Sequence, residues 1–262
     1  GHLKNTETAA ILNISTTFLN QWCWPLLLVI SGMASTYALR KRSLTQFFNE
    51  RSLRLLVPFV FSILVLTPPL LYLGVFDPYI SCSDFYSAIL TDIPTLLEII
   101  SSQHMWFSSY LFLYSLITIP LIVFLQRGDD QKFISNLSKM TAYDWGFMTY
   151  LIPIFISQLI LKPFFPIETR SLVDDWAYFV LNLFFFIAGI FIVNSESIWK
   201  QLMSRRLFHL ALGLISLGLM IGLKSINWID YQHYLRVELD TIFTFIKLVV
   251  TWSWVLIFLG YG

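Results

Sequence analysis

Seven long apolar runs, separated by shorter polar segments, dominate the chain. They cover roughly residues 18–39, 55–76, 106–125, 147–164, 177–194, 207–223 and 242–260. An α-helix needs about 20 mostly apolar residues to cross the hydrocarbon core of a bilayer. The runs do not alternate between apolar and polar positions, as the strands of a membrane barrel do. The pattern therefore predicts an all-α, polytopic transmembrane helical bundle of about seven spans, in a single domain over residues 1–262.

The composition supports this location. Hydrophobic residues make up 56% of the chain and charged residues only 13%, whereas about 25% of the residues of a soluble domain are charged. The bilayer is therefore the expected surrounding, and the net charge of +1 gives no sign of a nucleic-acid partner. Two cysteines and four histidines form no metal-ligand pattern. We expect no metal site and no permanently bound cofactor.

Basic residues are distributed unevenly between alternate loops. The loops 40–54, 126–146 and 195–206 together carry 11 Lys and Arg residues, against 5 in the N-terminal tail and the remaining loops. Short loops rich in Lys and Arg stay on the cytoplasmic side of a membrane. The distribution predicts that these three loops are cytoplasmic and that the loop 77–105 faces the outside.

The first basic loop, RKRSLTQFFNERSLRLLVP, offers a candidate site. Arg51 and Arg54 are three residues apart, so on an α-helix they share a face at the mouth of the next span. Guanidinium groups bind phosphate in a two-pronged geometry. The alternative is a short cytoplasmic loop that is merely attracted to anionic lipid, and the sequence alone leaves both interpretations open.

The segment SSQHMWFSSY, residues 101–110, sets His104 two positions before Trp106 at the start of an uncharged apolar run. One interpretation is a pair of interfacial side chains at the membrane boundary. The other is a polar group that belongs to a site inside the bundle. On the outer side, Asp175 precedes the fifth run and either stabilises the start of a helix or takes part in binding. Lys247 lies within the last run, near enough to its outer end to reach water.

The first run contains LLLVISGMAS, with small residues at 31, 32, 34 and 35. Small side chains let membrane helices approach closely. This stretch is therefore predicted to be a helix-packing face.

The succession WPLLLVISGMAS, RSLRLLVP and QHMWF resembles the acyltransferase-3 family of integral membrane proteins, most closely its glucan-biosynthesis-protein-C subgroup. The segments HLKN and DDWAYFVLNLFFFIAGIFIVNS are also similar to that subgroup. The order of these elements agrees over essentially the whole chain. In the family, a histidine in the first helix is regarded as essential, and here it would lie upstream of Gly1. We therefore expect an internal piece of a longer, ten-helix domain, incomplete at both ends and inactive by itself.

The resemblance implies transfer of an acyl group, of acetyl or succinyl type, from an acyl-CoA co-substrate to a hydroxyl of an envelope or extracytoplasmic glycan. It implies a multi-pass protein of the bacterial inner membrane. Arg51 and Arg54 match the family's donor-binding arginines, and His104 with Trp106 matches its histidine-x-tryptophan motif. His104 is thus the catalytic candidate, with Trp106 and Asp175 as acceptor-binding candidates.

A membrane transporter of a polar or lipid-linked solute is the alternative function. Transporters combine proline-broken helices with inverted repeats. Pro68, Pro69 and Pro153 fit the first feature, but the sequence contains no visible repeat.

Overall fold

The computed structural model describes residues 10–66, 106–126, 131–170, 174–225 and 236–262, together with residues 69, 72, 81, 83, 84, 87, 91 and 172. Every regular element within these ranges is helical, as predicted. The α-helices are α1 (Ala10–Lys41), α2 (Leu44–Arg51), α3 (Val57–Phe61), α7 (Trp106–Ile117), α8 (Ile119–Gln126), α9 (Gln131–Thr141), α10 (Leu151–Leu161), α11 (Trp176–Val193), α12 (Glu196–Ser204), α13 (Arg206–Ser225) and α14 (Arg236–Tyr261). Two π-helical turns, η1 (Ser52–Leu56) and η2 (Ser62–Leu66), flank α3, and a 3₁₀ turn, η3 (Gly146–Tyr150), precedes α10.

Four helices in the described ranges are long and apolar enough to cross a membrane, namely α1, α11, α13 and α14. They correspond to four of the predicted runs. A fifth run is the pair α7 and α8, which together pass the same test and meet at a bend of 45°. Pro120, two residues beyond the break, has no N–H for the helical ladder, and this accounts for the bend.

The two remaining runs do not form long, continuous α-helices in the described ranges. The stretch Gly146–Leu161 is apolar but shorter than the long helices. The described part of the run 55–76 combines α and π turns, and most of its apolar side chains are exposed, for example Val57 and Phe61. Such an exposed apolar surface suits contact with lipid.

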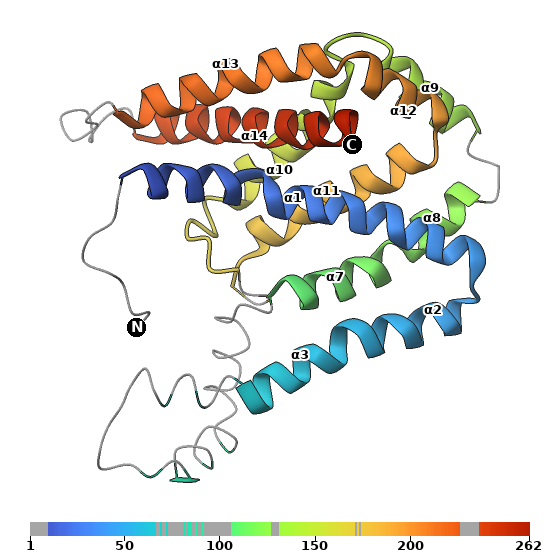
Figure 1. Ribbon diagram of the computed structural model, residues 1–262, viewed down its shortest axis with the longest axis vertical. Coiled ribbons are helices and arrows are strands. Elements are labelled where there is room, and N and C mark those ends of the chain that lie inside the picture. Colours follow the sequence, from blue (N-terminus) through green and yellow to red (C-terminus); the bar gives the residue numbers. More distant parts are fainter. Residues whose placement is uncertain are drawn as a thin grey trace.

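The long helices lie side by side, and the chain runs back and forth between two ends (Figure 1). α1 packs along α11 on one side and α14 on the other, and α13 packs along α14. α7 lies beyond α11, and the segment from α2 to η2 lies beyond α7 (Figure 1). Large buried side chains such as Leu28, Tyr114, Phe186 and Trp252 fill the contacts between these helices.

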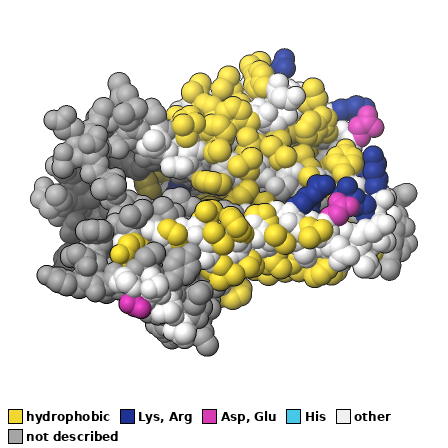
Figure 2. Space-filling model, turned by 60° about the horizontal axis from the view of Figure 1, so that its bottom comes forward, with side chains coloured by type: hydrophobic (Ala, Val, Ile, Leu, Met, Phe, Trp, Pro, Cys, Tyr) yellow, Lys and Arg dark blue, Asp and Glu magenta, His cyan; other side chains and the backbone are white. Residues whose placement is uncertain are grey.

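The three loops predicted to be cytoplasmic meet at one end of the bundle, which we call the basic end. Arg40 donates a hydrogen bond of 2.7 Å to the side chain of Asn194. Arg205 pairs with Asp144 at 2.9 Å. Figure 2 shows Lys and Arg side chains gathered at this end, beside a broad hydrophobic surface. The structure thus confirms that the three loops share one side, and the assignment of that side to the cytoplasm remains a prediction from the charge distribution.

Candidate functional site

Arg51 is held against α1 at the basic end. Ser43 opens α2 with a capping box, in which its side chain accepts a hydrogen bond from the backbone N–H of Gln46 and its own N–H donates to the Gln46 side chain. At the other end of α2, Arg51 Nη2 donates to Ser35 Oγ of α1 at 2.8 Å. The guanidinium also lies over the ring of Phe47, 5.2 Å from its centroid. These contacts fix one cation at the mouth between α1 and α2.

Arg54 lies in a π-helical turn and not in the regular α-helix assumed from the sequence. Its side chain is 74% exposed, and its nearest carboxylate, Glu50, is 3.9 Å away. The π-helical turn spans Ser52–Leu56. In such a turn each hydrogen bond spans five residues instead of four, so there are more residues per turn. Three residues therefore rotate the chain about the helix axis by a smaller angle than they do in an α-helix. The two arginines share an end of the bundle but differ in exposure and in their partners.

Positive charge is in excess around Arg51. Glu50 pairs with Arg42 at 2.8 Å and with Arg54 at 3.9 Å, and Arg51 lies near enough to feel the charge of the same carboxylate. Burial first, and then repulsion from Arg54 and Arg42, lower the pKa of Arg51. A bound anion would relieve this repulsion, and phosphate matches the guanidinium geometry.

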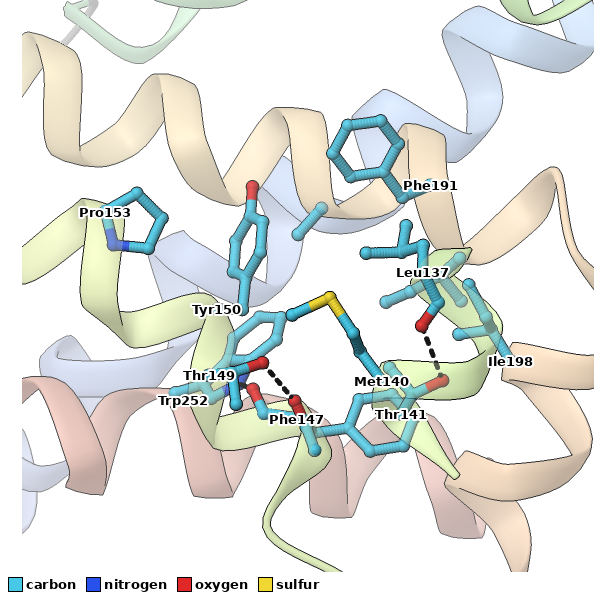
Figure 3. Close-up of a pocket in the computed structure, with 13 residues that line it drawn as sticks. Leu137, Met140, Thr141, Phe147, Thr149, Tyr150, Pro153, Phe191, Ile198 and Trp252 are labelled. Carbon is cyan, nitrogen blue, oxygen red and sulfur yellow. Dashed lines mark hydrogen bonds between the residues drawn. The ribbon is translucent and has the colours of Figure 1, made fainter. Parts of the chain in front are cut away.

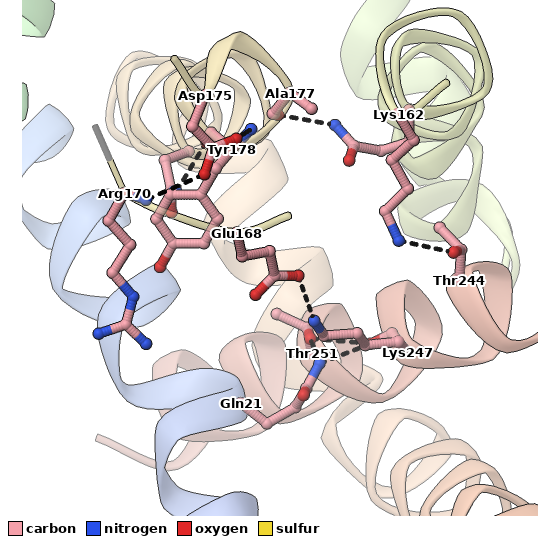
Figure 4. A network of polar contacts seen from close by, with 12 residues as sticks. Gln21, Lys162, Glu168, Arg170, Asp175, Ala177, Tyr178, Thr244, Lys247 and Thr251 are labelled. Carbon is pink, nitrogen blue, oxygen red and sulfur yellow. Dashed lines mark hydrogen bonds and ion pairs between the residues drawn. The ribbon is translucent and has the colours of Figure 1, made fainter. Parts of the chain in front are cut away.

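A second, polar site lies at the end opposite the basic end. We call it the polar pocket, a cavity of about 270 Å³ between α1, α10, α11 and α14 (Figure 4). Amide, hydroxyl and charged side chains line it together with a few apolar ones: Asn20, Gln21, Pro25, Gln158, Lys162, Glu168, Arg170, Tyr178, Leu181, Asn182, Phe185, Thr244, Lys247, Leu248 and Thr251. Amides and hydroxyls of this kind hydrogen-bond a polyhydroxylated ligand.

An ion pair crosses the polar pocket. Lys247 Nζ of α14 contacts Glu168 Oε1 at 2.7 Å, and Gln21 of α1 donates to the carbonyl of Lys247 at 3.1 Å. Burial raises the pKa of Glu168, but the neighbouring Lys247 and Lys162 lower it by more, so the net shift is downward and the carboxylate stays charged. Lys247 therefore reaches out of its span as predicted, and it meets a partner from the loop that precedes α11.

Asp175 caps α11 and anchors the loop before it. Its carboxylate accepts hydrogen bonds from the backbone N–H of Tyr178 at 2.9 Å and of Arg170 at 3.0 Å. Arg170 has a φ of 60°, a left-handed conformation that is costly for a residue with a side chain. Burial raises the pKa of Asp175, while the backbone hydrogen bonds oppose the shift. Asp175 is only 1% exposed, so it supports the pocket wall from behind. Of the two interpretations that the sequence left open, the structure shows the helix cap, and a role in acceptor binding stays a prediction.

Trp106 likewise lies behind the pocket. It is 4% exposed, and its ring packs against Trp24, Tyr110 and Tyr178 with centroids 5.3–5.4 Å apart. The guanidinium of Arg170 lies over the ring at 5.5 Å. The ring of Trp106, an acceptor-binding candidate from the sequence, is therefore enclosed by neighbouring side chains. His104 lies outside the described residues.

Comparison with known proteins decides the family. A family model described as an acyltransferase domain, acyltransferase 3, matches residues 2–262. The chain belongs to the acyltransferase-3 family. It is an integral membrane acyltransferase, in agreement with the apolar helices. No curated protein and no solved structure gives a significant match.

The acyltransferase also contains an apolar cavity of about 230 Å³, between α9, η3, α10, α11, α12 and α14 (Figure 3). The polar atoms in its wall are satisfied internally. Thr149 donates to the carbonyl of Gly146 at 2.6 Å, and Trp252 Nε1 donates to the carbonyl of Phe147 at 2.7 Å. The cavity therefore suits hydrocarbon.

Metal ligands are not grouped in the described part of the acyltransferase, where no cluster of three His, Cys, Asp or Glu side chains occurs. The polar groups that do converge are those of the polar pocket and those around Arg51. Sequence reasoning missed Arg170 and Glu168 as members of a site. The signal for Glu168 was indirect, since a lysine within a span calls for a partner. No feature of the sequence indicated Arg170, because its left-handed backbone depends on a hydrogen bond to Asp175.

Proposed function

We propose that this acyltransferase moves an acyl group of acetyl or succinyl type from acyl-CoA to a hydroxyl of an envelope or extracytoplasmic glycan. The observation that carries the proposal is the separation of two polar sites. A fixed guanidinium stands at the basic end, and a hydroxyl- and amide-lined pocket stands at the opposite end. The positive-inside rule assigns the basic end, and with it the guanidinium site, to the cytoplasm, where acyl-CoA is made. A bacterial inner membrane and a glucan acceptor follow from the subgroup resemblance.

Arg51 and Arg54 bind the phosphates of the donor in this proposal. Arg51 is already oriented by Ser35 and Phe47, so little side-chain freedom is lost on binding. Arg54 is exposed and free to close over a ligand. Three cations around Glu50 supply the charge that a diphosphate neutralises.

The chemical step is attack of the acceptor hydroxyl oxygen on the thioester carbonyl. A general base takes the hydroxyl proton, the carbon–sulfur bond breaks, and the thiol leaves with a proton. Hydrogen-bond donors stabilise the oxyanion that forms on the carbonyl oxygen. In the resemblance, the base is a histidine of the family's first helix, and His104 positions the acceptor or assists, with neutral imidazole present near pH 7.

The acceptor enters from the polar pocket. Trp106 and Asp175 act indirectly, because both contact the wall residues Arg170 and Tyr178. An aromatic ring and a buried carboxylate behind the wall keep these two side chains in place for the ligand.

Acyl transfer from radiolabelled acyl-CoA, measured in membranes that contain the whole protein, tests the proposal. Arg51→Ala should lower transfer and acyl-CoA binding by at least about ten-fold, because a charge-assisted hydrogen-bonding site is lost. Arg51→Lys should restore part of the loss, since an ammonium lacks the two-pronged geometry. Arg54→Ala should have a smaller effect. Lys200→Ala is the matched control, because Lys200 is 73% exposed at the same end and pairs only with Glu196 within the described residues. Wild-type binding and transfer in Arg51→Ala would refute the donor site.

A further inference from the structure

The polar pocket carries more positive charge than its carboxylates neutralise. Lys247 is paired with Glu168 at 2.7 Å. The carboxylate of Asp175 is occupied by backbone N–H groups and is buried. Lys162 and Arg170 remain. Glu168 attracts both of them, but among the described residues neither forms an ion pair. The lining of the pocket therefore holds two more cations than carboxylates.

Lys162 is held in place by a neutral partner. Its Nζ donates to Thr244 Oγ1 of α14 at 2.9 Å, and it lies close enough to Lys247 for the two ammonium groups to repel each other. Asp240 borders an adjoining cavity with Lys162, but the two form no ion pair in the described structure. A ligand anion would find this ammonium already oriented by its hydroxyl partner.

Arg170 is held in place by its backbone and by one aromatic ring. Asp175 fixes the left-handed backbone through the N–H of Arg170, and Trp106 lies beneath the guanidinium. Neither contact uses the N–H donors of the guanidinium. Figure 4 shows the side chain extending from the loop beside Glu168, with its donors unoccupied by the residues drawn. A strained backbone that presents a free guanidinium to a cavity fits a binding role better than a packing role.

We propose that the polar pocket selects an acceptor whose terminal sugar bears an anionic group, a carboxylate or a phosphate, which Lys162 and Arg170 bind. The amides of Gln21 and Asn182 then contact the hydroxyls of the same ring. A cavity of about 270 Å³ has room for one substituted sugar ring, and the adjoining cavity that shares Gln158, Lys162 and Thr244 with it has room for the rest of the acceptor. The inference rests on the proposed function only in naming the bound molecule as the acyl acceptor.

Equilibrium binding to the purified whole protein in nanodiscs tests this, with glucuronate, glucose 6-phosphate and glucose as probes. At low salt, at least one of the two anions should bind about ten-fold or more tightly than glucose, and added salt should reduce that preference. Comparison of the two anions tells whether carboxylate or phosphate is preferred. Equal affinity for glucose and both anions, or no binding of any probe, would overturn the proposal.

Variants assign the preference to residues. Arg170→Gln and Lys162→Gln should each lower the ratio of anion affinity to glucose affinity several-fold, because each replaces a cation that binds the anionic group with a neutral amide. Asp175→Asn tests whether Asp175 positions Arg170. It should lower the ratio of anion affinity to glucose affinity. A general loosening of the fold would weaken the binding of both probes and would leave this ratio unchanged. Lys200→Gln, at the other end of the bundle, should behave as wild type. An unchanged preference in both Arg170→Gln and Lys162→Gln refutes the site. Because no acyl donor is present, this result is independent of the Arg51 experiment.

Discussion

Gly32 of α1 and Gly189 of α11 lie against each other's helix backbone. A Cβ atom on Gly32 would collide with the carbonyl of Phe186, and a Cβ atom on Gly189 would collide with the carbonyl of Val29. The two helices therefore approach as closely as their main chains allow. Close approach through small residues is the main source of helix association within lipid, where apolar burial contributes little.

Replacement of either glycine by alanine should separate α1 from α11. We expect Gly32→Ala and Gly189→Ala each to destabilise the protein by about 1–3 kcal/mol, the usual cost of overpacking. Thermal unfolding in detergent, followed by size-exclusion chromatography, measures this. Gly218→Ala is the matched control, because a Cβ atom there meets nothing within 4 Å. Equal melting temperatures for Gly32→Ala and Gly218→Ala would contradict the close approach.

The ion pair between Glu168 and Lys247 should make stability depend on pH in the acid range. The pKa of Glu168 is lowered below its ordinary value of 4.5, so the folded state favours the carboxylate. The contribution of the ion pair to the free energy of unfolding is then present above about pH 4.5 and is lost as the pH falls through the lowered pKa of Glu168. The pair is partly exposed, and we expect an effect of about 1–3 °C on the melting temperature at pH 7.

Comparison of wild type with Glu168→Gln between pH 7 and pH 3 measures this contribution. The difference in melting temperature should be present at pH 7 and vanish toward pH 3. Glu196→Gln provides the control, since Glu196 forms an equally short pair with Lys200 at 2.7 Å but both side chains are more than 70% exposed. A Glu168→Gln protein that melts at the wild-type temperature at pH 7 would show that the ion pair contributes nothing.

The orientation in the membrane can be tested by cysteine labelling in a background without Cys23 and Cys82. A membrane-impermeant maleimide added to intact cells should label Ser83→Cys, because the loop 77–105 is predicted to face outward. Ser43→Cys lies at the start of α2 at the basic end and should react only after permeabilisation. Labelling of Ser43→Cys but not Ser83→Cys in intact cells would invert the topology and would place Arg51 on the outside.

The sequence by itself determined the helical class, most of the long spans and the grouping of the basic loops. Each of these features depends on a short stretch of sequence or on one external constraint, the bilayer. The length of an apolar run sets whether a helix can cross the bilayer, and the excess of Lys and Arg sets which loops share a side. The small residues around Gly32 and the outward reach of Lys247 were predictable for the same reason, since each depends on one helix and its surroundings.

Only the tertiary structure decided which residues meet. Gly189 opposes Gly32, Ser35 receives Arg51, and Glu168 pairs with Lys247 across 79 positions of the chain. Helix periodicity specifies the face of each residue but not the crossing point of two helices, which depends on how all the side chains pack. Arg170 is the clearest case. Its left-handed backbone exists because the buried carboxylate of Asp175 accepts its N–H, and no local preference of the sequence encodes that contact.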